Sequence, residues 1–291
     1  MANSLREVKQ RISSTESTAQ ITKAMYMVSS SKVKKAEKNF KNYHDFMIRK
    51  KEMVQHMIHK ASDDFKHPLL EERPVEKIAY LIVTSDRGLA GAYNSSVYKA
   101  LEERIKLNNE DVNNLIFGAI GKQGFGYLKR KNYSLISNNP TLIRDDVMFI
   151  DIFPLAKSFI DMYIAKEIDK LVIVYNHYIN SLSQEIVFEE LLPITNLMAS
   201  EADIDYVYET GIEKTLNLVL PMYIQDIIYG IILDAKVSEH SARMNSMRNA
   251  TDNAKEVINK LQLLYNRARQ GAITTELIDI IGGANAIGGD A

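Results

Sequence analysis

The sequence of 291 residues contains no cysteine and no tryptophan. The absence of cysteine excludes disulfide frameworks, thiolate catalysis, zinc ribbons and thiol redox switches. Long uncharged apolar runs are lacking too, because the nearest one, residues 215–233, is interrupted by Pro221 and Asp226. We therefore expect no membrane-spanning segment. The first residues enter charged sequence without an apolar signal core or an Arg- and Ser-rich presequence, which predicts a chain that stays in the cytoplasm.

Glycine and proline are scarce at both ends of the chain. Of the 13 Gly and 6 Pro, none lies in residues 1–67 and none in residues 231–270. These two residue types interrupt helices most strongly, so their absence predicts a long helix at each end.

Both predicted helices carry a coiled-coil pattern. Alternating steps of three and four residues from Leu5 to Met57 give sixteen positions, of which twelve are apolar, where the composition alone would give about seven. The same alternation continues from Thr251 to Thr275, with six of eight positions apolar, whereas residues 227–248 follow it poorly. Two such helices, far apart in sequence, are predicted to pair as an antiparallel hairpin.

The middle of the chain alternates short apolar runs with helical stretches. This alternation is typical of an α/β domain with a largely parallel sheet. We predict strands at residues 78–84, 115–120, 133–136, 171–175 and 185–191, and helices at residues 96–107, 122–131 and 145–165. The predicted fold class is α/β, with a long antiparallel coiled coil of the terminal helices and an inserted Rossmann-like domain. Its four segments are a coiled-coil helix at 1–60, a linker at 61–76, the α/β domain at 77–207, and a second coiled-coil helix with its tip at 208–291.

The small net charge of −1 hides an uneven distribution. Residues 1–60 carry thirteen Lys and Arg against five Asp and Glu, a net of +8, whereas residues 61–207 carry fifteen against twenty-two, a net of −7. A basic segment can serve nucleic acid, an anionic membrane or an acidic protein. Phe40 and Tyr43 belong to the apolar pattern and do not alternate with the lysines as base-stacking residues would, which favours a solvated or acid-facing helix.

Two glycine-containing segments are the places where catalytic chemistry could reside. The turn at residues 84–91 follows a predicted strand, and Lys122 lies within a second cluster of glycines. Neither has the spacing of a dinucleotide-binding loop, and Gln123 stands where a phosphate-binding loop needs Ser or Thr. The six histidines form no metal-binding spacing. We therefore predict no catalytic residue, no cofactor and no metal, with a nucleotide-binding α/β enzyme bearing a coiled-coil arm left as an alternative.

Three segments resemble one known family. They are ITKAMYMVSSSKVKK at residues 21–35, TSDRGLAGAYN at residues 84–94, and the stretch 235–277 with SEHSARMNSMRNATDNA, LYNRARQ and AITTEL. In this order they resemble the gamma subunit of the F-type, ion-translocating ATP synthase, and the resemblance covers the whole chain.

The resemblance implies a central rotor shaft without an active site of its own. It implies that one copy turns inside a ring of alpha and beta subunits, coupling ion flow to ATP synthesis or hydrolysis. Further implied partners are the epsilon subunit and the ring of c subunits, and the implied location is peripheral, on the cytoplasmic side of the cell membrane. No nucleic acid is expected, although a coiled-coil nucleic-acid binder remains a second alternative.

The resemblance also implies two sets of contact residues. The predicted contacts with the catalytic ring are Lys23, Met25, Arg243, Arg269 and Gln270. The predicted contacts with the c ring and the epsilon subunit are Tyr206, Tyr208 and Glu209. The residues from Ile273 to Ile287 are expected to form an apolar shaft tip.

Overall fold

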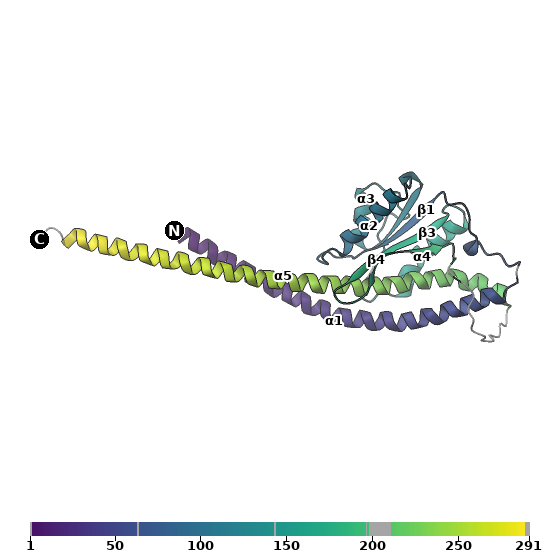
Figure 1. The fold of residues 1–291 in the computed structure, drawn as a ribbon, viewed down its shortest axis with the longest axis horizontal. Coiled ribbons are helices and arrows are strands. Elements are labelled where there is room, and N and C mark those ends of the chain that lie inside the picture. Colours follow the sequence, from purple (N-terminus) through teal and green to yellow (C-terminus); the bar gives the residue numbers. More distant parts are fainter. Residues whose placement is uncertain (1, 63, 143, 196, 198–210, 289–291) are drawn as a thin grey trace. The chain divides into compact units, whose positions relative to one another are not determined.

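A computed structural model describes residues 2–62, 64–142, 144–195, 197 and 211–288. The chain forms two units, one of residues 1–28 and 244–291 and one of residues 29–243. Helices α1 (Ala2–Lys60) and α5 (Ile212–Gly288) each contribute to both units (Figure 1). Both predicted long helices are thus present.

Helix α5 contains a proline in its interior. The helix starts at Ile212, so Pro221 lies beyond its first turn, the part of a helix where the missing N–H of proline costs nothing. An internal proline costs a helix about 3 kcal/mol. Burial of Leu216, Leu220 and Ile224 against the core offsets this cost, since each is 0% exposed.

The first unit is an antiparallel pair of helical segments, residues 2–28 of α1 and residues 244–288 of α5. Few of its side chains are buried, and the small ones among them let the two backbones approach closely. The Thr251 hydroxyl donates a hydrogen bond across the pair to the Thr22 hydroxyl at 2.8 Å. The buried residues are Val8, Thr22, Met247, Thr251, Ala254 and Leu261.

The second unit contains a four-stranded sheet in the order β2-β1-β3-β4. Strands β1 (Ile78–Val83), β2 (Leu115–Ile120) and β3 (Lys170–Tyr178) are parallel, and β4 (Gln184–Leu192) pairs antiparallel with β3. The predicted largely parallel sheet is confirmed. The strand predicted at residues 133–136 is wrong, because this segment forms only a single bridge, between Leu135 and Phe117.

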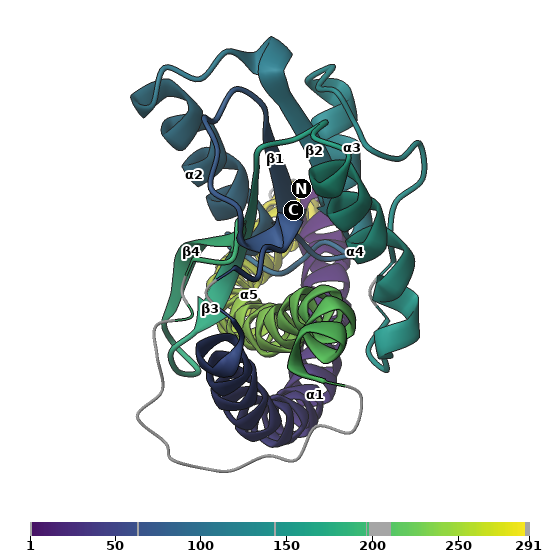
Figure 2. The same cartoon turned by 90° about the vertical axis from the view of Figure 1, so that its right-hand side faces the viewer.

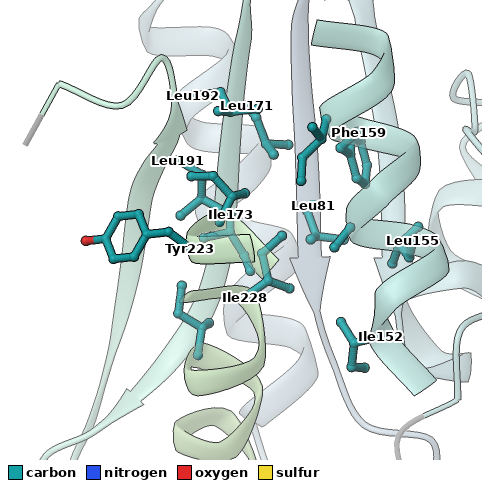
Figure 3. Close-up of a cluster of buried hydrophobic side chains, with 14 of the residues drawn as sticks. Leu81, Ile152, Leu155, Phe159, Leu171, Ile173, Leu191, Leu192, Tyr223 and Ile228 are labelled. Atoms are coloured by element: carbon teal, nitrogen blue, oxygen red, sulfur yellow. The ribbon is translucent and has the colours of Figure 1, made fainter. Parts of the chain in front are cut away.

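Helices cover both faces of this sheet. Helices α2 (Tyr93–Leu107) and α3 (Lys122–Arg130) pack on one face, while α4 (Phe149–Ile164) and α5 pack on the other, with α1 beyond α5 (Figure 2). Alternate residues of β1 serve the two sides, with Tyr80 facing α2 and α3 and Leu81 facing α4 and α5. In Figure 3, Leu81 and Phe159 lie close together between β1 and α4. Burial on both faces explains why the strands read as continuous apolar runs.

Two further segments differ from expectation. Helix α4 begins at Phe149 and not at residue 145, because the Asp151 carboxylate accepts a hydrogen bond from the Met148 N–H at 2.9 Å and caps the helix there. The segment 61–76 contains a short 3-10 helix, η1 (Pro68–Leu70), whose Leu69 is completely buried in the core.

Helix α5 is apolar enough, by length and composition, to cross a membrane over residues Ile212–Gly282. This finding corrects the expectation that no segment reaches that threshold. In the most apolar window, 56% of residues are buried inside the structure. Burial against protein is what the core helix of a water-soluble domain also displays.

Candidate functional site

The turn at residues 84–91 packs directly against the second glycine cluster. The Thr84 hydroxyl donates to the Ile120 carbonyl at 2.9 Å and accepts from the Gly124 N–H at 2.9 Å. A Cβ on Gly121 would lie 2.2 Å from the Thr84 carbonyl oxygen, and Gly121 has a φ of +93°. The glycines therefore make room for Thr84, which occupies the space that a phosphate would need in a phosphate-binding loop.

Asp86 connects the same turn to the first residue of helix α3. Its carboxylate accepts a hydrogen bond from the Lys122 N–H at 3.0 Å. The N-terminal N–H groups of a helix are the ones that bind anions, and here a side chain of the protein already serves one of them. Both features that motivated the enzyme alternative thus have a structural role.

A cluster of buried charges on α5 lies beside this turn. Glu239 forms ion pairs with Lys236 at 3.0 Å and with Arg243 at 2.9 Å. The Arg243 guanidinium also donates to the Arg87 carbonyl at 3.1 Å and to the Gly88 carbonyl. Arg243 thereby fixes the turn at residues 84–91 against α5.

A neutral histidine and one further ion pair extend the cluster toward α1. His240 lies 3.2 Å from Asp145 through Nε2, and Asp145 in turn pairs with Lys32. Burial lowers the pKa of His240 to about 4, so this imidazole is neutral at physiological pH. Burial opposes ionisation of Glu239 as well, but the neighbouring charges of Lys236 and Arg243 prevail and lower its pKa.

This cluster is not among the predicted site residues, although the sequence contains a signal for it. The coiled-coil pattern fails between residues 227 and 248. Within this interval, three charged side chains of the second unit, Lys236, Glu239 and Asp234, are less than 9% exposed. Charged residues where apolar ones are expected indicate a buried polar network.

The predicted contact residues lie in different places. Lys23, Arg269 and Gln270 are exposed in the first unit, and Met25 is half-buried there. Because Thr22 contacts Thr251, the neighbouring Lys23 lies near Thr251 of α5. Arg269 lies about 27 Å further along α5, at about 1.5 Å per residue. Arg243 belongs to the second unit, and only 11% of its side chain is exposed. Tyr206, Tyr208 and Glu209 lie outside the residues that the structure describes.

The end of α5 in the first unit exposes large apolar side chains. Ile273, Leu277, Ile278, Ile280 and Ile281 are between 50% and 62% exposed. A water-exposed stripe of this kind marks a surface that another protein covers.

Among the described residues, no group of three or more His, Asp or Glu side chains converges to hold a metal ion.

Comparison with known proteins decides the family. A family model described as ATP synthase matches residues 4–287. The chain belongs to this family, that of the ATP synthase gamma chains. It is a rotor-shaft chain of an F-type ATP synthase, and neither the enzyme nor the nucleic-acid alternative is favoured.

Solved structures of this family share the fold. The central stalk and c-ring structure of the Tetrahymena thermophila mitochondrial ATP synthase contains a chain 26% identical, with a TM-score of 0.58, covering 79% of this chain and 99% of that one. A chain of the Euglena gracilis mitochondrial enzyme is 17% identical, with a TM-score of 0.66, covering 100% and 97%. A chain of the Euglena gracilis rotor is 16% identical, with a TM-score of 0.59, covering 94% and 100%. At such low identity, the two Euglena gracilis chains support the fold alone.

Membership of the ATP synthase gamma family places the chain in a membrane-associated complex that makes ATP. It also agrees with the three segments that carried the resemblance, since the matched range includes all of them.

Proposed function

We propose that this gamma chain is a non-catalytic shaft, present once per complex, inside a ring of alpha and beta subunits. Ion flow through a c ring turns it, and each orientation stabilises a different conformation of each beta subunit. The observation that carries this proposal is the helix pair of the first unit, whose α5 segment exposes large apolar side chains at residues 273–281. One asymmetric object on a threefold axis can make three equal subunits differ, whereas three symmetric copies cannot.

Native mass spectrometry of the chain assembled with its alpha and beta partners tests the stoichiometry. The expected particle contains three alpha, three beta and one gamma chain, and a bead fixed to the second unit should rotate when ATP is added. Three gamma chains per particle, or no ATP-dependent rotation, would contradict the proposal.

The proposal assigns no active site to the chain. Thr84 and Asp86 already occupy the positions where a phosphate would bind, so ATP and NAD should not bind the isolated chain. Calorimetry measures this directly. Micromolar binding of ATP that is lost in Lys122→Ala would restore the enzyme alternative.

We propose that Lys23, Met25, Arg269 and Gln270 contact the catalytic ring, where the two basic side chains form charge-assisted hydrogen bonds to carboxylates. Two observations support this proposal. The side chains of Lys23 and Arg269 are exposed, and neither forms an ion pair with another residue of the described chain. Arg243 stays a predicted ring contact, although its donors point to Glu239 and to the turn carbonyls. The predicted contacts with the c ring and epsilon subunit at 206–209 stay predictions.

Arg269→Glu tests the ring contacts, and Arg267→Glu is the matched control, because Arg267 is also exposed and lies two residues away on the same helix. Reversal at Arg269 should lower ATP-driven ion pumping about tenfold, the equivalent of one charge-assisted hydrogen bond. Equal pumping by the two variants would remove Arg269 from the set.

We propose, finally, the segment division 1–60, 61–76, 77–207 and 208–291 as the functional division of the chain, and a peripheral position on the cytoplasmic side of a cell membrane. Family membership supports the membrane association. Fractionation should recover the chain with membranes and release it at low ionic strength, when the peripheral part of the complex detaches.

A further inference from the structure

The second unit contains a cavity of about 360 Å³ that the shaft function does not use. Three elements enclose it: α1, the paired strands β3 and β4, and α5. Cavities of small-molecule sites begin at about 300 Å³, and they combine apolar walls with a few polar groups. The apolar wall here is made by Phe40, Tyr43, Met47, Ile48, Ile227 and Ile231.

The polar end of the cavity holds two carboxylates in different situations. Asp234 uses both oxygens within the protein: one lies 2.6 Å from His177 Nδ1, and the other accepts from the Tyr178 N–H at 3.0 Å. Glu189 has only the Tyr175 hydroxyl as a hydrogen-bond donor, and within the described chain no cationic nitrogen lies within 4.0 Å of it. Glu189 is therefore the carboxylate available to a ligand.

The position of Glu189 breaks the pattern of its strand. Val187 and Leu191 point into the apolar core that lies between the sheet and α5, and Glu189 stands between them on the same face. A carboxylate at such a position loses its hydration, and burial accordingly raises its pKa. Glu189 is half-buried, and the charge of Lys51 favours its ionisation without a direct ion pair. A half-buried carboxylate in this situation is found mostly where a partner of opposite charge binds.

A glycine keeps one wall open. Gly230 lies inside α5 and lines the cavity, and a Cβ there would meet the Tyr43 ring at 3.4 Å. Glycine in a helix interior costs about 1 kcal/mol relative to alanine. Glycine is therefore present at position 230 despite its lower helix stability, at a place where a side chain would extend into the cavity toward Tyr43.

From these observations we propose that the cavity binds an organic ammonium ion, with the ammonium on Glu189 and an aromatic or aliphatic body against the apolar wall. His44 and His177 line the same end, and Tyr223 completes the wall beside Glu189. Lys51 lies at the rim with an exposed side chain and is the one basic residue of the lining besides the two histidines. It competes with the ligand for Glu189, and this competition provides a second test.

Three probes of similar shape and different charge test the proposal on the full chain. Tryptamine is the cation, tryptophol the neutral analogue and indole-3-acetate the anion, and calorimetry measures their affinities at pH 8. Tryptamine should bind at least tenfold more tightly than tryptophol, and indole-3-acetate should bind most weakly. Equal affinities for the three, or no binding of tryptamine at millimolar concentration, would overturn the proposal.

Two variants and a control locate the binding. Glu189→Gln should weaken tryptamine at least tenfold and leave tryptophol unchanged, whereas Lys51→Met should strengthen tryptamine about threefold. The control is Glu185→Gln, which removes the same charge from the same strand and face, at an exposed residue that does not line the cavity. Loss of tryptamine binding in the control as large as in Glu189→Gln would overturn the assignment to this cavity. So would unchanged tryptamine binding in both Glu189→Gln and Lys51→Met.

Discussion

The two units of this gamma chain differ in how many of their apolar side chains they bury. The second unit has apolar cores on both faces of its sheet, with many side chains at 0% exposure. The first unit buries a few residues along one helix contact, and its α5 segment leaves five large apolar side chains at least half exposed between residues 273 and 281. The second unit therefore contains the apolar packing that a fold of its own needs, whereas the first is completed by whatever surrounds it.

This difference assigns the two units different roles. A sparse contact between two helices leaves their outer faces free for partners, as a shaft requires. In the second unit, the dense core holds the ends of its helices, the turn at residues 84–91 and the α5 charge cluster in fixed positions relative to one another. Substitutions confined to one unit should therefore affect stability and coupling separately.

The largest effect on stability is expected from Phe159→Ala. The Phe159 ring is fully buried and packs over Gly118, where a Cβ would lie 2.5 Å from it. Truncation should lower the free energy of unfolding by about 3–5 kcal/mol, through lost burial and the cavity left behind. Phe153→Ala is the control on the same helix, because Phe153 is 37% exposed. Urea denaturation measures both, and equal losses would show that α4 does not depend on its buried face.

In the first unit, Ala254→Pro is expected to abolish coupling while the second unit stays folded. Ala254 is buried in the middle of the helix pair, and proline there removes a hydrogen bond and clashes one turn back, at a cost of about 3 kcal/mol. ATP-driven ion pumping by membranes that carry the variant is the measurement, with Ala254→Ser as the size-matched control. Normal pumping by Ala254→Pro would contradict a continuous helix at this position.

Arg243→Met is expected to cost the second unit about 2–3 kcal/mol. The substitution keeps much of the apolar stem, but it removes an ion-pair partner from the buried Glu239 and a donor from the Arg87 and Gly88 carbonyls. Arg248→Met provides the comparison, since Arg248 is exposed on the same helix. Thermal unfolding should separate the two variants clearly, and a loss below 0.5 kcal/mol for Arg243→Met would mean that the cluster does not fix the turn.

The fold was predictable from the sequence where the same residue pattern repeats along the chain. Sixteen coiled-coil positions and three apolar strands repeat a simple rule, so both helices and the parallel core of the sheet were predictable. The strand predicted at residues 133–136 rested on a single local signal, and it does not form. Pro221 inside α5 likewise shows tertiary packing prevailing over the local preference of a single residue. Leu220 before the proline and Ile224 after it are both fully buried, and they hold α5 in its helical conformation on both sides of Pro221.

The site was predictable only in part, for a related reason. The apolar residues at 273–281 were expected from the resemblance, which implied an apolar shaft tip at residues 273–287. The α5 charge cluster and the Glu189 cavity depend on side chains from segments far apart in sequence, such as Asp145 with His240 and Glu189 with Tyr175. No spacing within one segment reveals such a meeting.

Glu189→Gln is expected to alter the pH dependence of stability in the second unit. Burial raises the pKa of Glu189 in the folded state, so its contribution favours folding below the unfolded pKa of about 4.3 and is lost as the pH rises through the folded value. The neutral amide avoids that loss, and the variant should be about 1 kcal/mol more stable than wild type at pH 8. Glu185→Gln should follow the wild-type profile, and a Glu189→Gln profile parallel to wild type would mean that this carboxyl is well solvated.

The smallest effect concerns the polar contact within the first unit. Thr251 donates to Thr22 at 2.8 Å, and both side chains are less than 10% exposed. Replacing either one by valine, which has the same shape, should cost about 0.5 kcal/mol. The remaining hydroxyl loses its partner across the helix pair but keeps a backbone carbonyl of its own helix, that of Thr18 for Thr22 and that of Met247 for Thr251. Replacing both should cost less than the sum of the single losses, since two apolar groups of the same shape then meet. A double-mutant cycle by thermal unfolding measures this coupling energy, and strict additivity of the two substitutions would mean that the hydrogen bond does not fix the register of the two helices.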